Sequence, residues 1–171
     1  VRCCRCQVGV GAFRRFRLMP ELPEVEVDRS GLAQLIPGRR ISAVTVLHPR
    51  PVRRHVGGPD DFASVLVGRR FAEPKRRGKF IWLPFTDGDA LMAHLGMSGQ
   101  FRVDAPEAEL PPQCRVRFAF DDGGPEIRFA DQRMFGGLWL SPGGAELPVE
   151  VAHIARDLFD PELDRDALVA D

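Results

Sequence analysis

The sequence predicts an α+β fold that is mostly β: an antiparallel β-sandwich flanked by an N-terminal helix and a short second helix. Short segments rich in β-branched and aromatic residues recur between residues 40 and 140, with Gly-rich or Pro-rich turns between them. Helical patterning is confined to the segment after Met19 and to a short stretch near residue 60. The 171 residues are enough for one domain with a substantial core.

The first helix is expected to begin near Pro23. Proline suits the first turn of a helix, and the carboxylates of Glu24 and Glu26 favour its positive end. Pro37 and Gly38 then stop the helix. The apolar residues that fall near one face are Val25, Leu32, Leu35 and Ile36.

The remaining elements are mostly strands. The strand-like segments are 41–47, 80–85, 90–94, 115–120 and 127–129. Residues 60–67 are expected to form the short second helix, with Asp60 or Asp61 as its cap and Gly68 as its stop. Many short strands with a helix at one end indicate a sandwich, but periodicity leaves the strand order open.

Three regions differ in patterning. Residues 1–18 show neither helical nor strand periodicity, and we expect them to be a non-native or misannotated extension. Residues 19–141 form the patterned domain. Residues 142–171 are expected to be a linker followed by the start of a truncated helical domain, because residues 161–169 have the composition of a helix start.

Charge is distributed unevenly along a chain whose formal net charge is zero. Residues 48–79 contain nine Lys and Arg against three carboxylates, which favours a polyanionic partner, whereas the chain after Leu140 is acidic. No apolar run is long enough to cross a bilayer, and the first residues lack the apolar core of a signal peptide. We therefore expect a cytoplasmic, nucleoid-associated protein that does not contact membranes.

The cysteines form neither a disulfide framework nor a complete metal site. Cys3, Cys4 and Cys6 crowd into the first six residues, and Cys114 stands alone in the patterned domain. Cys3 and Cys6 have half of a zinc or redox spacing, but a second ligand pair is missing. We predict that this chain holds no metal and no other cofactor.

The segment from Met19 to Glu26 is the most informative for chemistry. If translation starts at Met19 and this methionine is removed, Pro20 becomes a secondary amine that can form a Schiff base with a sugar carbon. The positive end of the following helix lowers the pKa of such an amine, and Glu21 can move protons beside it. A Pro-Glu-x-Pro-Glu string is otherwise more typical of a helix entry.

Three further segments suggest contacts with DNA. Two glycines around Met97 would carry this residue on a loop tip, where an apolar side chain can fill the gap left by an extruded base; a place in the core is the alternative. Arg133 and Phe135 would reach the same side of an extended loop. Lys79 ends a basic run, 76–79, that reads as a hairpin tip beside the sugar-phosphate backbone or as a solvated charge run.

These segments together, in this order and spacing, resemble the formamidopyrimidine-DNA glycosylase family, also called 8-oxoguanine DNA glycosylase/AP lyase. The resemblance spans residues 19 to about 168, so residues 19–141 would be the N-terminal catalytic domain. It implies a bifunctional base-excision repair enzyme of bacteria. The enzyme would act as a monomer on double-stranded DNA that carries 8-oxoguanine or a formamidopyrimidine.

The resemblance also assigns roles to individual residues. Pro20 would be the Schiff-base nucleophile, Glu21 the proton donor for base release, and Lys79 the proton donor for β-elimination. The intercalating residues would be Met97, Arg133 and Phe135. Leu22 occupies a position where the endonuclease VIII group, which prefers oxidised pyrimidines, has glycine, and this favours the purine-directed branch.

The sequence departs from the family pattern at two places. Gln113 falls where the family has a DNA-contacting histidine, so phosphate binding there is expected to be weaker. The helix-two-turn-helix module and the C-terminal four-cysteine zinc finger, whose zinc is structural, are not in this sequence. With residues 1–18 attached, Pro20 would also be a tertiary amide, so we expect the chain as written to be weak or inactive.

Three functions therefore remain open at this point. The first is a DNA glycosylase/lyase domain for oxidised purines or, in an endonuclease VIII-like version, for oxidised pyrimidines. The second is a damaged-DNA-binding module without chemistry, which would use the basic stretch and the apolar wedges. The third is a structural fragment with an exposed interface. A requirement for a free Pro20 amine distinguishes the first from the other two.

Overall fold

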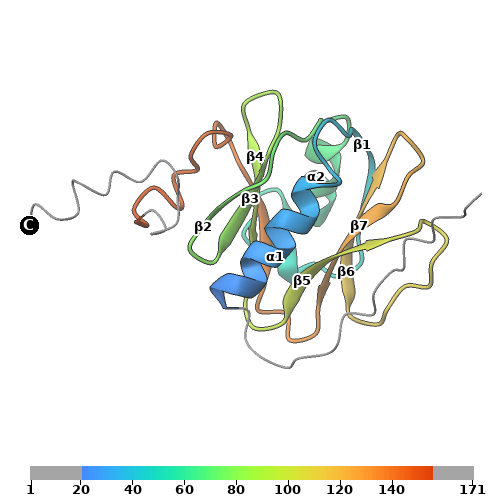
Figure 1. The fold of residues 1–171 in the computed structure, drawn as a ribbon. Helices are drawn as coiled ribbons and strands as arrows, with labels where there is room; N and C mark the ends of the chain where they lie inside the picture. Colours follow the sequence, from blue (N-terminus) through green and yellow to red (C-terminus); the bar gives the residue numbers. More distant parts are fainter. Residues whose placement is uncertain (1–20, 156–171) are drawn as a thin grey trace, which may run out of the picture.

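The computed structural model describes residues 21–155, and Figure 1 shows their arrangement. The helices are α1 (Leu22–Ala33), the 3-10 helix η1 (Arg50–Val52) and α2 (Gly58–Leu66). The strands are β1 (Ile41–Val46), β2 (Lys75–Arg77), β3 (Phe80–Pro84), β4 (Ala90–His94), β5 (Gly99–Asp104), β6 (Cys114–Phe120), β7 (Glu126–Asp131) and β8 (Gly137–Ser141).

The strands form two antiparallel four-stranded sheets that face each other. The first sheet has the order β1-β6-β7-β5 and the second the order β2-β3-β4-β8. Apolar residues from both sheets and both helices meet in one continuous core, in which Phe71, Phe118 and Phe129 are almost fully buried. The predicted α+β sandwich with two flanking helices is therefore confirmed.

The two helices close opposite open sides of the sandwich (Figure 1). Helix α1 contacts β5 at the edge of the first sheet and β2 and β3 at the edge of the second. On the other side, α2 contacts β1 and η1, and η1 in turn contacts β8. Helix α1 thus spans both sheets, and α2 with η1 does so on the other side, which covers apolar edge positions that would otherwise meet water.

Helix α1 begins as the sequence predicts. Glu21 is its N-cap, and a capping box joins Glu21 and Glu24: each side chain accepts a hydrogen bond from the other residue's backbone N–H. Val25 and Leu32 point into the core, and Ile36 beyond the helix end is also buried, whereas Leu35 is partly exposed.

The second helix begins two residues earlier than predicted. It starts at Gly58 with Gly57 as its N-cap, so Asp60 and Asp61 lie in the first turn rather than at the cap. There the two carboxylates favour the positive end of the helix through charge. Gly68, in the left-handed region with φ 87°, follows its end as expected.

Three strands lay outside the predicted set. Strand β2 is three residues long and directly precedes the predicted hairpin turn, Gly78 and Lys79. Strands β5 and β8 both begin with glycine, a residue typical of turns, yet β5 pairs with β7 and β8 pairs with β4. Pairing with a neighbouring strand is a non-local effect that outweighs the local preference.

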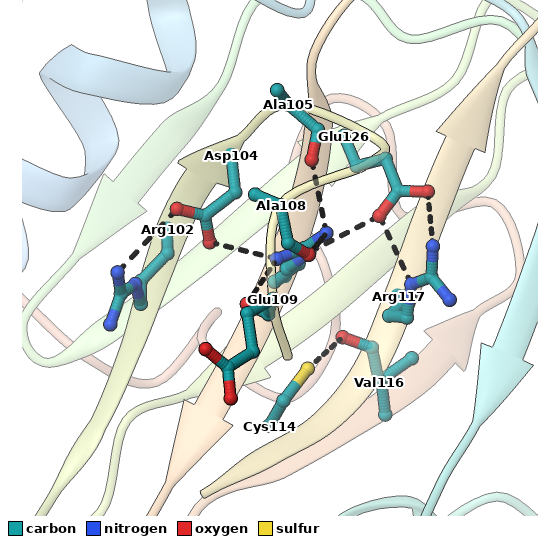
Figure 2. Close-up of polar contacts among 10 residues, drawn as sticks. Arg102, Asp104, Ala105, Ala108, Glu109, Cys114, Val116, Arg117 and Glu126 are labelled. Carbon is teal, nitrogen blue, oxygen red and sulfur yellow. Dashed lines mark hydrogen bonds and ion pairs between the residues drawn. The ribbon is translucent and has the colours of Figure 1, made fainter. Parts of the chain in front are cut away.

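A buried arginine ties the loop between β5 and β6 to the first sheet (Figure 2). Arg128 has no solvent exposure, and its guanidinium donates to the backbone carbonyls of Ala105, Ala108 and Glu109. The same group pairs with Glu126 at 3.1 Å and lies 3.5 Å from Asp104. A buried charge is thus paired and hydrogen-bonded, as such a site requires.

The chain beyond β8 folds back over the outer face of the second sheet. Val151 is buried against a second apolar cluster that contains Trp82, Met92 and Trp139. Glu150 accepts hydrogen bonds from the Trp139 indole at 3.0 Å and from a serine hydroxyl at 2.8 Å.

In residues 21–155, every helix is too short or too polar to span a membrane. The predicted extension at 1–18 and the helix start at 161–169 lie outside the described residues.

Candidate active site and nucleic-acid interface

Two of the three predicted catalytic residues are in direct contact. The Lys79 ammonium lies 2.9 Å from a carboxylate oxygen of Glu21. Glu21 caps α1, and Lys79 is in the tight turn between β2 and β3, where Gly78 takes a φ of 55°. Both side chains are about half exposed, so they can meet a large substrate. Pro20, the third residue, lies outside the described residues and directly precedes Glu21 in sequence.

A partly exposed ion-pair cluster holds the hairpin against α1. Glu26 accepts hydrogen bonds from Arg29 on its own helix and, at 2.8 Å, from Arg76 of β2. Hydrogen bonding to Arg29, with help from Arg76, lowers the pKa of Glu26 to about 2. Glu26 therefore stays ionised across the physiological range, and the contact fixes the strand that leads to Lys79 next to the helix that begins at Glu21.

The predicted DNA-contacting residues lie on two loops that touch each other. Met97 is half-buried in the loop between β4 and β5, and exposed Arg133 and Phe135 lie in the loop between β7 and β8. The Arg133 guanidinium donates to the Met97 sulfur at 3.7 Å. Phe135 keeps 51% of its surface exposed, which is unusual for a phenylalanine in a well-packed domain. Met97 is therefore neither a core residue nor fully exposed.

The loop that carries Arg133 and Phe135 is not extended as predicted. Met134 between them adopts a φ of 57°, in the left-handed region. Two arginines of the preceding basic stretch support this shape: Arg50 donates to the Met134 carbonyl at 3.2 Å, and Arg53 donates to the Gly136 carbonyl at 2.9 Å. Tertiary contacts, which sequence spacing does not reveal, thus set the loop.

Strand register brings both groups to one end of the sandwich. Phe80 pairs with His94, and His94 pairs with Gly137, so three neighbouring strand ends lie side by side. Lys79 immediately precedes the first of them, the Met97 loop follows the second, and the Phe135 loop leads into the third. This is the lower end of the sandwich in Figure 1, where α1 also begins.

His94 belongs to this end of the molecule and was not among the predicted site residues. Its ring packs against Phe80, and its Nδ1 accepts a hydrogen bond from the Gly96 backbone N–H at 3.2 Å. Burial, reinforced by Arg54 and Lys79, lowers the pKa of His94 below its usual value. The available signal was its place directly before the Met97 loop.

Gln113 is half-buried at the end of the loop that Arg128 anchors. Its backbone carbonyl accepts a hydrogen bond from the Asp131 N–H at 2.9 Å. Asp131 in turn leads into the Arg133 loop, so Gln113 is adjacent to the predicted interface. The role of its side chain toward DNA stays a prediction.

The basic stretch 48–79 is only partly available to a polyanion. Four of its nine cations form ion pairs within residues 21–155: Arg69, Lys75, Arg76 and Lys79. Arg50 and Arg53 border a shallow open pocket lined also by His48 and His55, beside the Met134 loop. Among the described residues no cluster of His, Cys, Asp and Glu could hold a metal ion. Arg50 and Arg53 thus place positive charge beside the loop that carries Arg133 and Phe135.

Comparison with known proteins agrees with this arrangement. The family described as "Formamidopyrimidine-DNA glycosylase N-terminal domain" matches residues 19–138. The formamidopyrimidine-DNA glycosylase of Salinispora arenicola is 57% identical over 89% of this chain and 53% of its own length, and that of Streptomyces coelicolor is 54% identical over 87% and 53%. The chain thus spans about half the length of these relatives.

Solved structures give the same result. The chain resembles Lactococcus lactis Fpg (MutM) in a complex with DNA containing an oxidised pyrimidine, with a TM-score of 0.67, 30% identity, and coverage of 72% of this chain and 45% of that one. A complex of the same protein with AP-site DNA has a TM-score of 0.65 and 30% identity, covering 71% and 45%. By its sequence and by its fold, the chain belongs to the formamidopyrimidine-DNA glycosylase family.

Proposed function

We propose that this chain carries the catalytic domain of a base-excision repair DNA glycosylase with AP lyase activity, which removes 8-oxoguanine and formamidopyrimidines from double-stranded DNA. The observation that carries the proposal is the contact between Glu21 and Lys79, 2.9 Å apart, directly after Pro20 in sequence. A carboxylate, an ammonium and a potential secondary amine together supply what such chemistry needs: a nucleophile and two groups that move protons.

Base release begins with attack of the Pro20 nitrogen on the deoxyribose C1′. A bond forms between nitrogen and C1′ as the bond from C1′ to the base breaks, and the base leaves with that electron pair. The Glu21 carboxylate takes the proton that the amine loses and gives it to the departing base. Opening of the sugar ring, with protonation of O4′, then leaves a cationic Schiff base on Pro20.

Strand cleavage follows from the same adduct. The positive charge on the Schiff base acidifies the C2′ protons. One passes to water, its electron pair forms a C2′=C3′ double bond, and the bond from C3′ to the phosphate oxygen breaks. Lys79 donates a proton to the leaving phosphate group. The Glu21 carboxylate, 2.9 Å away, holds the Lys79 ammonium beside the reacting sugar-phosphate.

Access to the damaged base requires that it leave the helix. Met97, Arg133 and Phe135 lie at the same end of the sandwich as Lys79, and an exposed phenylalanine beside a methionine can fill the space that an extruded base leaves. Arg133 can donate to the unpaired partner base. The arginines beside the Met134 loop supply attraction for phosphates.

The test is borohydride trapping on a duplex that contains 8-oxoguanine. Three proteins are compared: this chain, a version that starts at Pro20, and a Pro20-start version extended to the length of its relatives. A free Pro20 amine can form a Schiff base that borohydride reduces, whereas a tertiary amide cannot, so we expect adducts from Pro20-start proteins and none from the chain with residues 1–19 attached. An undamaged duplex is the control. Absence of an adduct from the extended protein would overturn the enzyme proposal.

A second candidate is a damaged-DNA-binding module without chemistry. The exposed Phe135 and the arginines around the Met134 loop favour it, because neither feature depends on Pro20. It predicts salt-sensitive binding to damaged duplex that is the same with or without a free Pro20 amine. A trapped adduct excludes it as the sole function. Borohydride trapping on a duplex that contains an oxidised pyrimidine, carried out in parallel, tests whether the protein prefers oxidised purines.

A further inference from the structure

The two interface loops converge on a single buried carboxylate. Asp131 is fully buried at the end of β7. Its Oδ1 accepts a hydrogen bond from the Ser98 hydroxyl in the Met97 loop, and its Oδ2 accepts one from the Gly136 N–H in the Phe135 loop at 2.7 Å. One side chain therefore joins both loops, and we call these contacts the Ser98–Asp131 clasp.

The Ser98 hydroxyl completes the connection. While it donates to Asp131, it accepts a hydrogen bond from the Arg133 N–H at 2.8 Å. Ser98, next to Met97 in the loop, is thus hydrogen-bonded to the backbone of Arg133. The guanidinium of Arg133 in turn reaches the Met97 sulfur. The relative position of Met97 and Arg133 is set by this hydroxyl group.

Asp131 is itself fixed from both neighbouring strands. Its N–H donates to the Gln113 carbonyl at 2.9 Å, and its carbonyl accepts from the Arg115 guanidinium at 2.9 Å. Gly99 of β5 is its partner in the strand register. The carboxylate therefore projects from a rigid strand end, and the loops take their position from it.

A carboxylate at this place is costly for folding, which indicates a role in positioning. Burial of a charged group is expensive unless it is paired, and within residues 21–155 Asp131 takes part in no recorded ion pair. An apolar residue would avoid that cost but would leave the Ser98 hydroxyl and the Gly136 N–H without an acceptor. A carboxylate offers two acceptor oxygens, one for each loop.

We propose that Asp131 is a positioning residue that, through Ser98, locks the two loops together so that Met97, Arg133 and Phe135 enter damaged DNA as one rigid unit. This inference rests on the proposed function, since it concerns how the same site engages DNA. It predicts that loss of the clasp weakens recognition of an unstacked site, because Met97, Arg133 and Phe135, which we call the wedge, must then be ordered on binding. Contacts to the phosphates should stay intact.

The informative variant is Ser98→Ala in the 171-residue chain, with Ser98→Thr as the conservative form that keeps the hydroxyl. Ser64→Ala is the matched control, because the Ser64 hydroxyl also donates one hydrogen bond, to the Asp61 carbonyl at 2.9 Å, on the outside of α2. Affinity is measured for a duplex with a tetrahydrofuran abasic-site analogue and for an intact duplex. A 2-aminopurine beside the analogue reports unstacking by the wedge.

For Ser98→Ala we expect preference for the abasic-site duplex to fall by about five- to tenfold, as the loss of roughly one hydrogen bond implies, with a smaller 2-aminopurine signal. The affinity of Ser98→Ala for the intact duplex should stay at the wild-type value. Ser98→Thr and the Ser64→Ala control should bind both duplexes as the wild type does. In a Phe135→Ala background Ser98→Ala should add little, because the clasp acts through the wedge. Exchange of the Arg133 amide proton should also become faster in the free protein.

Two different failures can be told apart. If the wild-type chain prefers the abasic-site duplex and Ser98→Ala does so equally well, the positioning role is overturned and the proposed function stands. Equal losses on abasic and intact duplexes would also overturn it, because they would indicate general damage to the fold. If the wild-type chain, and its Pro20-start extended form, show neither preference nor 2-aminopurine signal, the proposed function itself fails.

Discussion

The Lys79 ammonium lies 2.9 Å from the Glu21 carboxylate, across a contact between a hairpin turn and the cap of a helix. The two residues are far apart in sequence, and neither occupies a position that the core requires. Local structure holds each residue in place: the capping box holds Glu21, and the turn at Gly78 holds Lys79. The contact therefore depends on how α1 packs against β2.

Replacing Lys79 with glutamine should separate the two chemical steps. In the Pro20-start protein extended to the length of its relatives, we expect β-elimination to slow by about a hundredfold, the lower end of what a general acid contributes. Base release should change less, because Glu21 remains. Rates of base release and strand cleavage on an 8-oxoguanine duplex measure the two steps.

Lys75→Gln is the matched control for that substitution. Lys75 lies on the same hairpin and forms an exposed ion pair with Glu146 at 3.1 Å, so its loss removes the same charge at a short distance from the site. If both variants slow cleavage equally, Lys79 acts by general attraction of DNA and has no role as a proton donor.

Asp28 should make the stability of the protein depend on pH. It lies on α1, accepts a hydrogen bond from the Phe101 N–H at 2.9 Å, and burial raises its pKa to about 7. A carboxyl whose pKa is raised on folding contributes stability that is present below its unfolded pKa, near 4, and lost as the pH rises through 7. Wild-type protein should therefore lose about 2–3 kcal/mol between pH 5 and pH 8 from this group.

Asp28→Asn removes the charge and keeps an oxygen that can accept from Phe101. We expect the free energy of unfolding of this variant, measured in urea, to exceed that of the wild type at pH 8 but not at pH 5. Asp121→Asn, a change at an exposed carboxylate, is the control and should gain nothing. An Asp28→Asn effect that is the same at both pH values would show that the Asp28 carboxyl does not titrate in this window.

Arg128 and Arg102 provide a comparison between a buried and an exposed partner of one carboxylate. Both lie near Asp104, and Figure 2 shows Arg102 beside it. Arg128 has no side-chain exposure, whereas Arg102 has 40%. Arg128→Met should cost about 3–5 kcal/mol of unfolding free energy, because it removes the buried guanidinium that donates to three carbonyls and one of the two arginines that pair with Glu126. Arg102→Met should cost less than about 1 kcal/mol. Equal costs in urea unfolding would show that burial does not decide the strength of this network.

Local patterning predicted much of the fold. The helix start near Pro23, the alternation in β6 and the glycine after α2 are each set by nearby residues, and the structure has all three. The strands that escaped prediction, such as β8, depend on a partner far away in sequence. Their pairing becomes visible only when β4 is in place.

The candidate site was predictable as a list of residues but not as a set of contacts. Motif spacing indicated Glu21, Lys79 and Phe135, because the chemistry needs those side chain types. Asp131 could not be recognised as the residue that joins two loops, since its acceptor role depends on a serine and an N–H brought together by strand register. The left-handed Met134 likewise follows from contacts with distant arginines.

Gly96 should be far less replaceable than a glycine of similar conformation elsewhere. Gly96 and Gly123 have φ values of 62° and 67°, so an alanine pays the left-handed cost of about 1–2 kcal/mol at either place. A Cβ at Gly96 would also lie 2.6 Å from the Gly136 nitrogen and from the Phe135 carbonyl carbon, whereas a Cβ at Gly123 would meet nothing within 4 Å. The atoms that a Cβ at Gly96 would meet are backbone atoms, so the loop must move. Gly96→Ala should therefore lower the unfolding free energy by more than Gly123→Ala and also weaken abasic-site recognition, as calorimetry and duplex binding can measure. Equal effects of the two substitutions would mean that the Phe135 loop can move at no cost in free energy. Such a result would exclude a rigid wedge.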